Sequence, residues 1–293
     1  MTTETLGRVR ALSSLVKISH TIFALPFAAS AVILATKRPH AELTVGRAAA
    51  MLACMVAART AAMAYNRYLD RDIDARNPRT KDREVPRGVV SPAAALGLTL
   101  GSSVAFALAA ATLGTWPLVL SPAVLLVLLG YSWTKRFTWA SHLVLGLALA
   151  LAPGGAWIAM GARPEPAILA LMLAVVTWVG GFDVLYSLQD ERFDRDNGLH
   201  SIPARFGTGS AVVVSAALHA VTVASLALSG VWLGCGASFF VGVALVSGLL
   251  IYEHAIVGRG NLERIDRAFF DINGYVSCAF FALTALDAWL VAS

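Results

Sequence analysis

Two clusters of acidic residues, each at the end of a long apolar segment, are the residues of this chain whose types and spacing could do chemistry. The first cluster runs from Asn66 to Asp74, and the second runs from Asp183 to Asp194. Carboxylates that recur every four residues share one side of a helix. Two such rows at a membrane surface could hold Mg²⁺, and through that ion a diphosphate.

The first cluster predicts a helix that continues outward from its apolar segment. At 100° per residue, Asn66, Asp70 and Asp74 spread over only about 80° of the helix circumference. Arg59 precedes Asn66 by seven residues, so it lies about 20° away and points to the same side from inside the apolar segment. Asp72 points elsewhere. We therefore expect Asn66, Asp70 and Asp74, but not Asp72, to be metal ligands.

The second cluster predicts a similar row. Asp183, Asp190 and Asp194 fall within about 40° of arc if the helix is continuous, and Asp190 and Asp194 are the expected metal ligands. Arg59 and Asp183 lie inside apolar segments, where an ionisable side chain facing lipid is costly, so both should face the interior of a helix bundle. Snorkelling of Arg59 to the interface is the alternative. Asp183 and Tyr186 are candidates to line a cavity.

Carboxylates alone would repel a diphosphate, so both rows need a bridging cation. Mg²⁺ keeps several waters and binds through a few carboxylates together with phosphate oxygens of a substrate. Basic side chains would take the remaining phosphate oxygens, and the candidates are Arg71, Lys81, Lys135, Arg136 and His200. The competing interpretation is a pair of solvated loops with ion pairs between residues four apart. The repetition of the same spacing in two loops favours the metal site.

The elements that must position these residues are membrane-spanning helices. Of the 293 residues, 57% are hydrophobic and only 14% are charged, whereas a soluble domain has about 25% charged residues. Mean hydropathy is +0.69, and long apolar runs recur along the whole chain. We predict that residues 1–293 form a single transmembrane domain, with spans at Ile18–Ala35, Ala48–Tyr65, Ala93–Thr112, Trp116–Trp133, Ser141–Met160, Pro166–Leu185, Ala211–Ser229, Val231–Ile251 and Phe269–Ala292.

The positions of the basic residues predict the topology. Lys and Arg are concentrated in the N-terminal segment and in the loops after the second, fourth, sixth and eighth predicted spans. Cytoplasmic loops carry an excess of Lys and Arg, so the N-terminus is predicted to be cytoplasmic. We interpret the formal net charge of +5 through this topology and expect no nucleic-acid partner. Cys54, Cys235 and Cys278 fall in three separate spans, which excludes a disulfide framework and a zinc site.

The two motifs resemble those of the UbiA superfamily of membrane aromatic prenyltransferases. The likeness covers almost the whole chain, and His200 stands where many relatives carry lysine. The family's Asn-x-x-x-Asp-x-x-x-Asp motif is matched by Asn66, Asp70 and Asp74, and its Asp-x-x-x-Asp motif is matched by Asp190 and Asp194. The arginine that precedes the first motif is matched by Arg59, and the Tyr-x-x-x-Lys-Arg segment by Tyr131, Lys135 and Arg136. Residues 79–83 and 198–207 match the charged stretches that follow the two motifs.

The resemblance implies an all-α fold of nine transmembrane helices around a central cavity, with the two acidic loops as a cytoplasmic cap. A polyprenyl diphosphate would bind through Mg²⁺ under the cap, with its tail toward membrane lipid. An aromatic ring would attack the allylic cation left by the diphosphate, with Asp70, Asp190 and Arg59 as catalytic residues. The implied acceptor is a hydroxylated aromatic acid, first 4-hydroxybenzoate on the ubiquinone route, and the implied location is the inner membrane of a bacterium.

Two alternatives stay open. A dihydroxynaphthoate, on a menaquinone route, would also serve as the acceptor. A cation-coupled transporter would use Arg59 and Asp183 along a substrate path. Transporters of this kind pair two broken helices at the membrane midplane, and the break expected at Pro153-Gly154-Gly155 in the fifth span has no clear partner. The acidic residues also cluster near the membrane surface, which favours the prenyltransferase.

Overall fold

The computed structural model describes residues 21–257, 265 and 268–292, and this part of the chain is helical and contains no strand. The all-α prediction is therefore confirmed for the described residues. The helices form two compact units. Unit 1 contains residues 45–133, and unit 2 contains residues 22–44 together with those from 134 onward.

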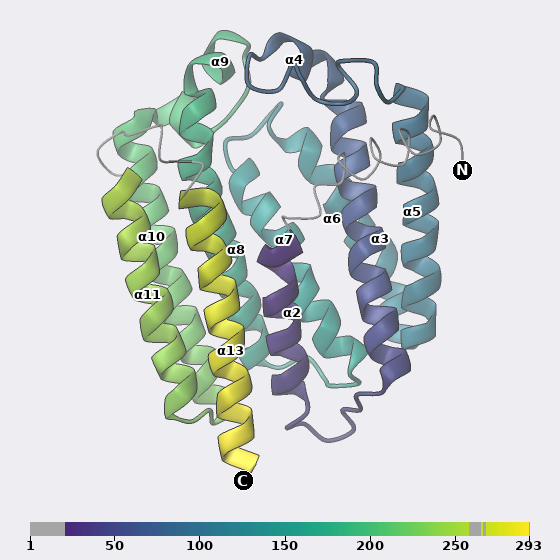
Figure 1. The fold of residues 1–293 in the computed structure, drawn as a ribbon, viewed down its shortest axis with the longest axis vertical. Coiled ribbons are helices and arrows are strands. Elements are labelled where there is room, and N and C mark those ends of the chain that lie inside the picture. Colours follow the sequence, from purple (N-terminus) through teal and green to yellow (C-terminus); the bar gives the residue numbers. More distant parts are fainter. Residues whose placement is uncertain (1–20, 258–264, 266–267, 293) are drawn as a thin grey trace. The chain divides into compact units, whose positions relative to one another are not determined.

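Unit 1 is built around two long helices that pack side by side, α3 and α5 (Figure 1). Ser91 caps the second of them, because its Oγ accepts a hydrogen bond from the Ala94 amide at 3.1 Å, and Pro92 occupies the first turn, where it requires no amide partner. Small residues such as Ala64 and Ala95 are fully buried in this unit and allow the backbones to approach closely. Its helices are α3 (Val45–Leu69), α4 (Arg71–Arg76), α5 (Pro92–Leu113) and α6 (Thr115–Thr134).

Unit 2 is built around α8, which packs against both α7 and α10, while α11 packs against α13. Trp178 of α8 is fully buried and its ring centroid lies 4.9 Å from that of Phe27. Gly146 of α7 lies so close to α8 that an added Cβ would clash with the Val176 carbonyl oxygen. The elements are α2 (Thr21–Ala35), α7 (Ser141–Ala159), α8 (Pro166–Tyr186), η2 (Ser187–Asp190), α9 (Glu191–Asp196), α10 (Ile202–Leu233), α11 (Ala237–Val257), η4 (Ala268–Ile272) and α13 (Asn273–Ala292).

The observed helices agree with most of the predicted spans. In the described part of the chain, eight helices are long and apolar enough to cross a membrane, and a shorter apolar helix covers Phe23–Ala35. Nine spans, a central cavity and a cytoplasmic cap stay predictions. The basic residues that fixed the predicted topology lie partly in the N-terminal segment and around residues 258–267, where most positions fall outside the described residues.

The predicted break between the seventh and eighth spans is wrong. The spans Ala211–Ser229 and Val231–Ile251 imply a break near residue 230, but α10 continues to Leu233 and α11 begins only at Ala237. The break is set by Gly234, whose φ of 64° places it in the left-handed conformation that ends a helix. Apolar residues continue up to this glycine, so hydropathy alone misplaced the end.

The break expected at Pro153-Gly154-Gly155 is also absent, because α7 runs through all three residues. Proline is tolerated inside a membrane helix when neighbouring groups satisfy the backbone. Gly154 has a packing role instead, because a Cβ at this position would lie 2.6 Å from the Met172 sulfur. The glycine therefore brings α7 close to α8.

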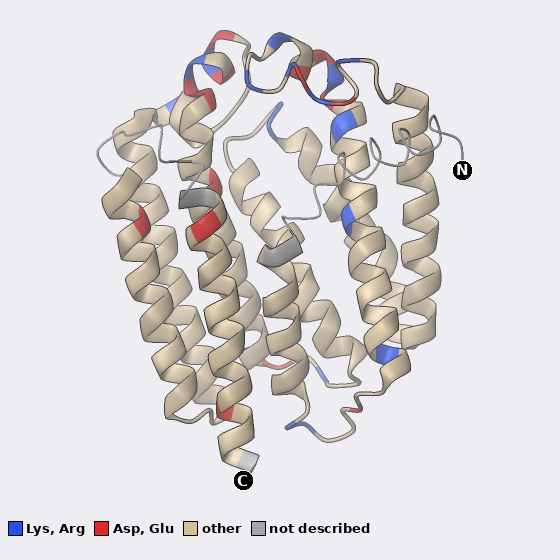
Figure 2. Ribbon diagram, in the orientation of Figure 1, with Lys and Arg blue, Asp and Glu red and all other residues tan. Residues whose placement is uncertain are grey.

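Charged residues gather at one end of the long helices within each unit. In unit 1 they are concentrated on and around α4, next to the ends of α3 and α5, and in unit 2 many lie on α9, beyond the end of α8 (Figure 2). These two groups contain the predicted carboxylate rows.

Candidate active site

The first carboxylate row keeps a helical register across the junction between α3 and α4. The Asp70 amide donates to the Asn66 carbonyl at 2.9 Å, and the Asp74 amide donates to the Asp70 carbonyl at 2.7 Å. These are hydrogen bonds between residues four apart, as in an α-helix. The Asn66 side-chain amide also donates to Asp70 Oδ2 at 2.8 Å, so the first two members of the row are in direct contact.

The outer member of this row is buried and paired with an arginine. Asp74 is only 5% exposed, and Arg83 Nη1 lies 2.8 Å from each of its carboxylate oxygens. The neighbouring Asp72 points outward, with 80% of its side chain exposed, as the helical spacing predicts. Arg83 was not among the predicted site residues, although it lies in the charged stretch after the first motif.

The basic residues around the first row differ in their surroundings. Arg71 of α4 turns back toward the end of α3, because its Nη1 donates to the Tyr68 carbonyl at 2.8 Å and its guanidinium lies 5.0 Å from the Tyr68 ring centre. Lys81 is exposed, and Arg59 is half-buried on α3. Sequence reasoning missed Arg67, which is 3% exposed and donates to Asn66 Oδ1 at 2.9 Å.

The second row does not follow a continuous α-helix. After α8 ends at Tyr186, residues Ser187–Asp190 form a 3₁₀ turn, and α9 starts at Glu191. A 3₁₀ turn advances about 120° per residue instead of 100°, which rotates Asp190 about 80° from its predicted direction relative to Asp183. Asp190 is 5% exposed and Asp194 is completely buried. The predicted 40° arc is therefore wrong, although Asp190 and Asp194 remain on adjoining turns.

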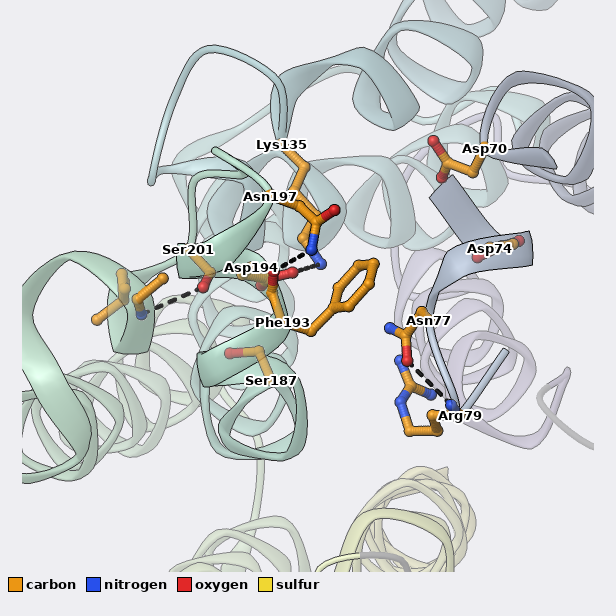
Figure 3. Close-up of polar contacts among 12 residues, drawn as sticks. Asp70, Asp74, Asn77, Arg79, Lys135, Ser187, Phe193, Asp194, Asn197 and Ser201 are labelled. Atoms are coloured by element: carbon orange, nitrogen blue, oxygen red, sulfur yellow. Dashed lines mark hydrogen bonds and ion pairs between the residues drawn. The ribbon is translucent and has the colours of Figure 1, made fainter. Parts of the chain in front are cut away.

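Lys135 is joined to the second row by an ion pair. Its Nζ lies 2.8 Å from Asp194 Oδ1 (Figure 3). The backbone strengthens this connection, because the His200 amide donates to the Lys135 carbonyl at 2.8 Å and the Leu199 amide donates to the Asp194 carbonyl at 2.8 Å. The His200 side chain is exposed, and Arg136 is half-buried. The structure thus brings Lys135 and the His200 backbone to the second row.

A histidine that the sequence did not single out holds the cavity candidate Asp183. His142 of α7 is 3% exposed, and its Nδ1 lies 2.6 Å from Asp183 Oδ2. The other ring nitrogen, Nε2, accepts a hydrogen bond from the Ile202 amide at 3.3 Å. Tyr186, the last residue of α8, is half-buried. No sequence spacing connects His142 with Asp183, because the contact depends on how α7 packs on α8.

The donor atoms of both rows suit Mg²⁺. Among the described residues, no three His, Cys, Asp or Glu side chains form a ready metal-binding group. Mg²⁺ does not require one, because it binds through one or two carboxylates together with waters and phosphate oxygens. The pairs Asp74–Arg83 and Asp194–Lys135 show that each row already attracts a cationic partner. In the first row Asn66, Asp70 and Asp74, and in the second row Asp190 and Asp194, have the oxygen atoms that could hold such an ion.

Known proteins match this chain over most of its length. The model of the UbiA prenyltransferase family matches residues 24–283. A 4-hydroxybenzoate octaprenyltransferase of Vibrio cholerae is 30% identical over 231 residues, which cover 79% of this chain and 81% of that protein. The protein of the same name from Pseudoalteromonas atlantica is 34% identical over 224 residues, which cover 75% of this chain and 77% of that protein.

Solved structures agree with these matches. A UbiA homologue from Aeropyrum pernix K1 is 36% identical and superposes with a TM-score of 0.83, covering 92% of this chain and 98% of that one. A UbiA homologue from Archaeoglobus fulgidus, solved with GPP and Mg²⁺, has the same fold with a TM-score of 0.70 at 19% identity, covering 95% of this chain and 99% of that one. The family model spans most of the sequence, and this chain belongs to the UbiA prenyltransferase family.

Proposed function

We propose that this protein transfers a polyprenyl group from polyprenyl diphosphate to 4-hydroxybenzoate in ubiquinone biosynthesis. The observation that carries the proposal is the presence of two carboxylate rows, each with a buried outer aspartate paired to a basic side chain. The names of the relatives, 4-hydroxybenzoate octaprenyltransferases, favour this acceptor over a dihydroxynaphthoate and favour a long prenyl chain. Membership of a prenyltransferase family gives no support to the transporter alternative.

The two rows divide the work of binding the diphosphate. Asp70 and Asp190 are the proposed catalytic carboxylates, and each supplies oxygens for Mg²⁺, which when bound neutralises charge on the diphosphate. Asp74 and Asp194 hold Arg83 and Lys135 by ion pairs of 2.8 Å. These cations are then available to phosphate oxygens as charge builds up on the leaving group. The other proposed diphosphate ligands are Arg71, Lys81, Arg136 and His200.

Arg59 is proposed to bind the carboxylate of the aromatic acid. It lies two helical turns from Asn66 toward the interior of α3. A guanidinium keeps its charge and offers paired donors that match a carboxylate. This placement would direct the acceptor ring toward the reacting carbon. Asp183 and Tyr186 are proposed to line a substrate cavity.

The reaction transfers carbon and releases a proton. The bond between the first prenyl carbon and the diphosphate oxygen breaks, and the electron pair leaves with the diphosphate. A ring carbon beside the hydroxyl forms the new bond to the prenyl carbon and then loses its hydrogen as a proton. Water must be kept from the allylic cation, which apolar helices achieve by excluding it. We propose that the enzyme works in a bacterial inner membrane, with its N-terminus cytoplasmic and the prenyl tail in lipid.

The direct test uses the full chain purified into lipid nanodiscs. Octaprenyl diphosphate and Mg²⁺ would be supplied with either 4-hydroxybenzoate or a dihydroxynaphthoate, and products would be identified by mass spectrometry. We expect the octaprenyl adduct of 4-hydroxybenzoate with its carboxylate intact. Exclusive prenylation of the naphthoate would overturn the acceptor assignment, and absence of any prenylated ring would overturn the function.

A further inference from the structure

We propose that Asp183 is the base that accepts the proton lost by the aromatic ring, and that His142 is a positioning residue that fixes the Asp183 carboxylate for this step. The inference rests on the proposed function, because it requires an aromatic acceptor. It assigns a role in the proton-transfer step to Asp183, which precedes the proposed metal ligands Asp190 and Asp194 along the chain, and to His142 of α7.

The hydrogen bonds of His142 define its protonation. The Ile202 amide can only donate, and it points at Nε2 of the ring at 3.3 Å. Nε2 must therefore carry the lone pair, which places the ring proton on Nδ1. That proton is donated to Asp183 Oδ2, 2.6 Å away. His142 is thus a neutral ring in one tautomer, and it has no vacant nitrogen with which to accept a proton from a substrate.

Asp183 has the properties of a proton acceptor. One carboxylate oxygen is fixed by His142, and within the described residues no other side chain forms a hydrogen bond or ion pair with the carboxylate. The Asp183 side chain is 23% exposed, whereas the His142 side chain is 4% exposed. The second oxygen therefore remains available to a substrate, and the imidazole behind the carboxylate sets its direction. This arrangement, in which a buried group orients the base, is common in proton-transfer sites.

The backbone around Asp183 is held firmly, so the position of the carboxylate is well defined. Ser215 Oγ of α10 donates to the Gly181 carbonyl at 2.8 Å. The His219 ring packs against Gly181, where an added Cβ would lie 2.4 Å from the ring. These contacts fix α8 against α10 two residues before Asp183, while His142 fixes α8 against α7.

The distance from Asp183 to Asp190 along the helix axis suits the reaction. Asp183 precedes Asp190 by three α-helical steps and four 3₁₀ steps, which gives a rise of about 12 Å and a rotation of about 60°. Asp183 therefore lies on the interior side of the proposed Mg²⁺ ligand Asp190. A diphosphate held at Asp190, its first prenyl carbon and one aromatic ring would together span such a distance. The proton would pass from the alkylated ring carbon to Asp183, and the C–H electron pair would restore the aromatic ring.

Two isosteric changes at His142 separate its two hydrogen bonds. The side-chain amide of His142→Asn can place an N–H where Nδ1 stands, so it keeps the bond to Asp183 and loses the bond to Ile202. The amide of His142→Gln reaches the position of Nε2, so it keeps the Ile202 bond and loses the bond to Asp183. Asp183→Asn keeps the shape and the bond from His142 but removes the base. Ser215→Ala is the matched control, because it loosens the same part of α8 without changing Asp183 or His142.

The readout is the ratio of kcat for ordinary 4-hydroxybenzoate to kcat for the acid deuterated at both carbons beside the hydroxyl, with octaprenyl diphosphate in nanodiscs. The wild type and Ser215→Ala should show a ratio near one, because proton loss is faster than carbon–carbon bond formation. Asp183→Asn and His142→Gln should lose about 100-fold in kcat, as expected for removal or misplacement of a base, and should show ratios well above one. His142→Asn should resemble the wild type.

The outcomes distinguish this inference from the proposed function. If the wild type forms no prenylated 4-hydroxybenzoate, the proposed function fails. If the wild type is active and Asp183→Asn keeps wild-type turnover, or if the slow variants show no isotope effect, only the present inference is overturned. It is also overturned if His142→Asn is the damaged variant and His142→Gln is not, since His142 would then act by anchoring α10. Thermal unfolding of each variant identifies losses caused by misfolding.

Discussion

The two carboxylate rows have the same spacing in the sequence but are built differently in the structure. In the first row, α-helical hydrogen bonds lead from Asn66 to Asp70 and on to Asp74. In the second row, a 3₁₀ turn ends at Asp190, and Asp194 lies on a new short helix. The first row is an α-helical extension of its membrane helix, whereas the second follows its membrane helix through a 3₁₀ turn.

The basic partners of the two rows also differ, because one is close in the sequence and the other is distant. Arg83 follows Asp74 within one loop, and their pair is formed locally. Lys135 follows α6 and reaches Asp194 from far away in the chain, and Asp194 is completely buried. The first row can therefore be stabilised by its own loop, while the second depends on tertiary packing.

The largest effect is expected from Asp70→Ala and Asp190→Ala. If both rows bind Mg²⁺, each substitution should nearly abolish turnover, because the diphosphate leaves too slowly without its metal ion. Product formation by purified variants in nanodiscs, followed by mass spectrometry, measures the loss. Thermal unfolding should be close to that of the wild type. Substantial turnover of one variant alone would show that only the other row binds the metal.

Removal of divalent metal should have a comparably large effect. Dense carboxylates opposite a diphosphate require a bridging cation, so EDTA should stop the reaction and added Mg²⁺ or Mn²⁺ should restore it. Conservative changes sharpen the comparison, since Asp70→Asn and Asp190→Asn should each raise the Mg²⁺ concentration that gives half-maximal activity. Full activity after exhaustive chelation would contradict the metal assignment for both rows.

Lys135→Met should be more damaging than Arg83→Met. The first change leaves a completely buried carboxylate without its 2.8 Å partner, with an expected loss of about 1–3 kcal/mol in the free energy of unfolding. Adding Asp194→Asn to Lys135→Met should recover part of this stability. Arg83→Met should destabilise less, because Arg83 and Asp74 pair within one loop.

The same pair of variants tests diphosphate binding. Both should raise KM for octaprenyl diphosphate, since each removes a cation that we assign to the phosphate oxygens. KM for 4-hydroxybenzoate should change little. A change confined to the aromatic KM would place Lys135 or Arg83 at the acceptor, and equal destabilisation by the two variants would remove the structural distinction between the rows.

Arg59→Lys should have a moderate and selective effect. Lysine keeps the charge but loses the planar pair of donors, so KM for 4-hydroxybenzoate should rise about tenfold, which corresponds to about 1.4 kcal/mol. A phenol without the carboxylate serves as the control, because its use should be poor and insensitive to the substitution. If the variant instead impairs binding of the prenyl diphosphate alone, Arg59 belongs to the diphosphate site.

Sequence reasoning succeeded where the structure is local. Apolar length placed most helices within a few residues, and the four-residue spacing correctly oriented Asp72 away from Asp74. It failed where a single residue or one short turn changes the geometry. Gly234 ends α10 inside an apolar stretch, and four residues of 3₁₀ helix rotate Asp190 from its expected direction.

The partners missed by sequence reasoning are of two kinds. Arg67 and Arg83 were present in the motif region, but a list of basic residues does not show which of them is buried against a carboxylate. His142 carries no local signal at all, because its contact with Asp183 arises when α7 packs on α8. Such tertiary contacts cannot be derived from periodicity, which describes only one helix at a time.

The smallest effect is expected from Asp72→Ala, and it tests the difference between position and charge. This change removes one negative charge from the same short helix as Asp74→Ala does, but the Asp72 side chain is 80% exposed and its ion-pair partner is Arg71, 3.6 Å away. Exposed pairs contribute about 0.2–1 kcal/mol, so kcat, both KM values and thermal unfolding should stay close to those of the wild type. Asp74→Ala should instead weaken diphosphate use, because it releases Arg83. If the two variants are equally impaired, the acidic charge of the loop, and not the helical side on which each carboxylate lies, determines activity.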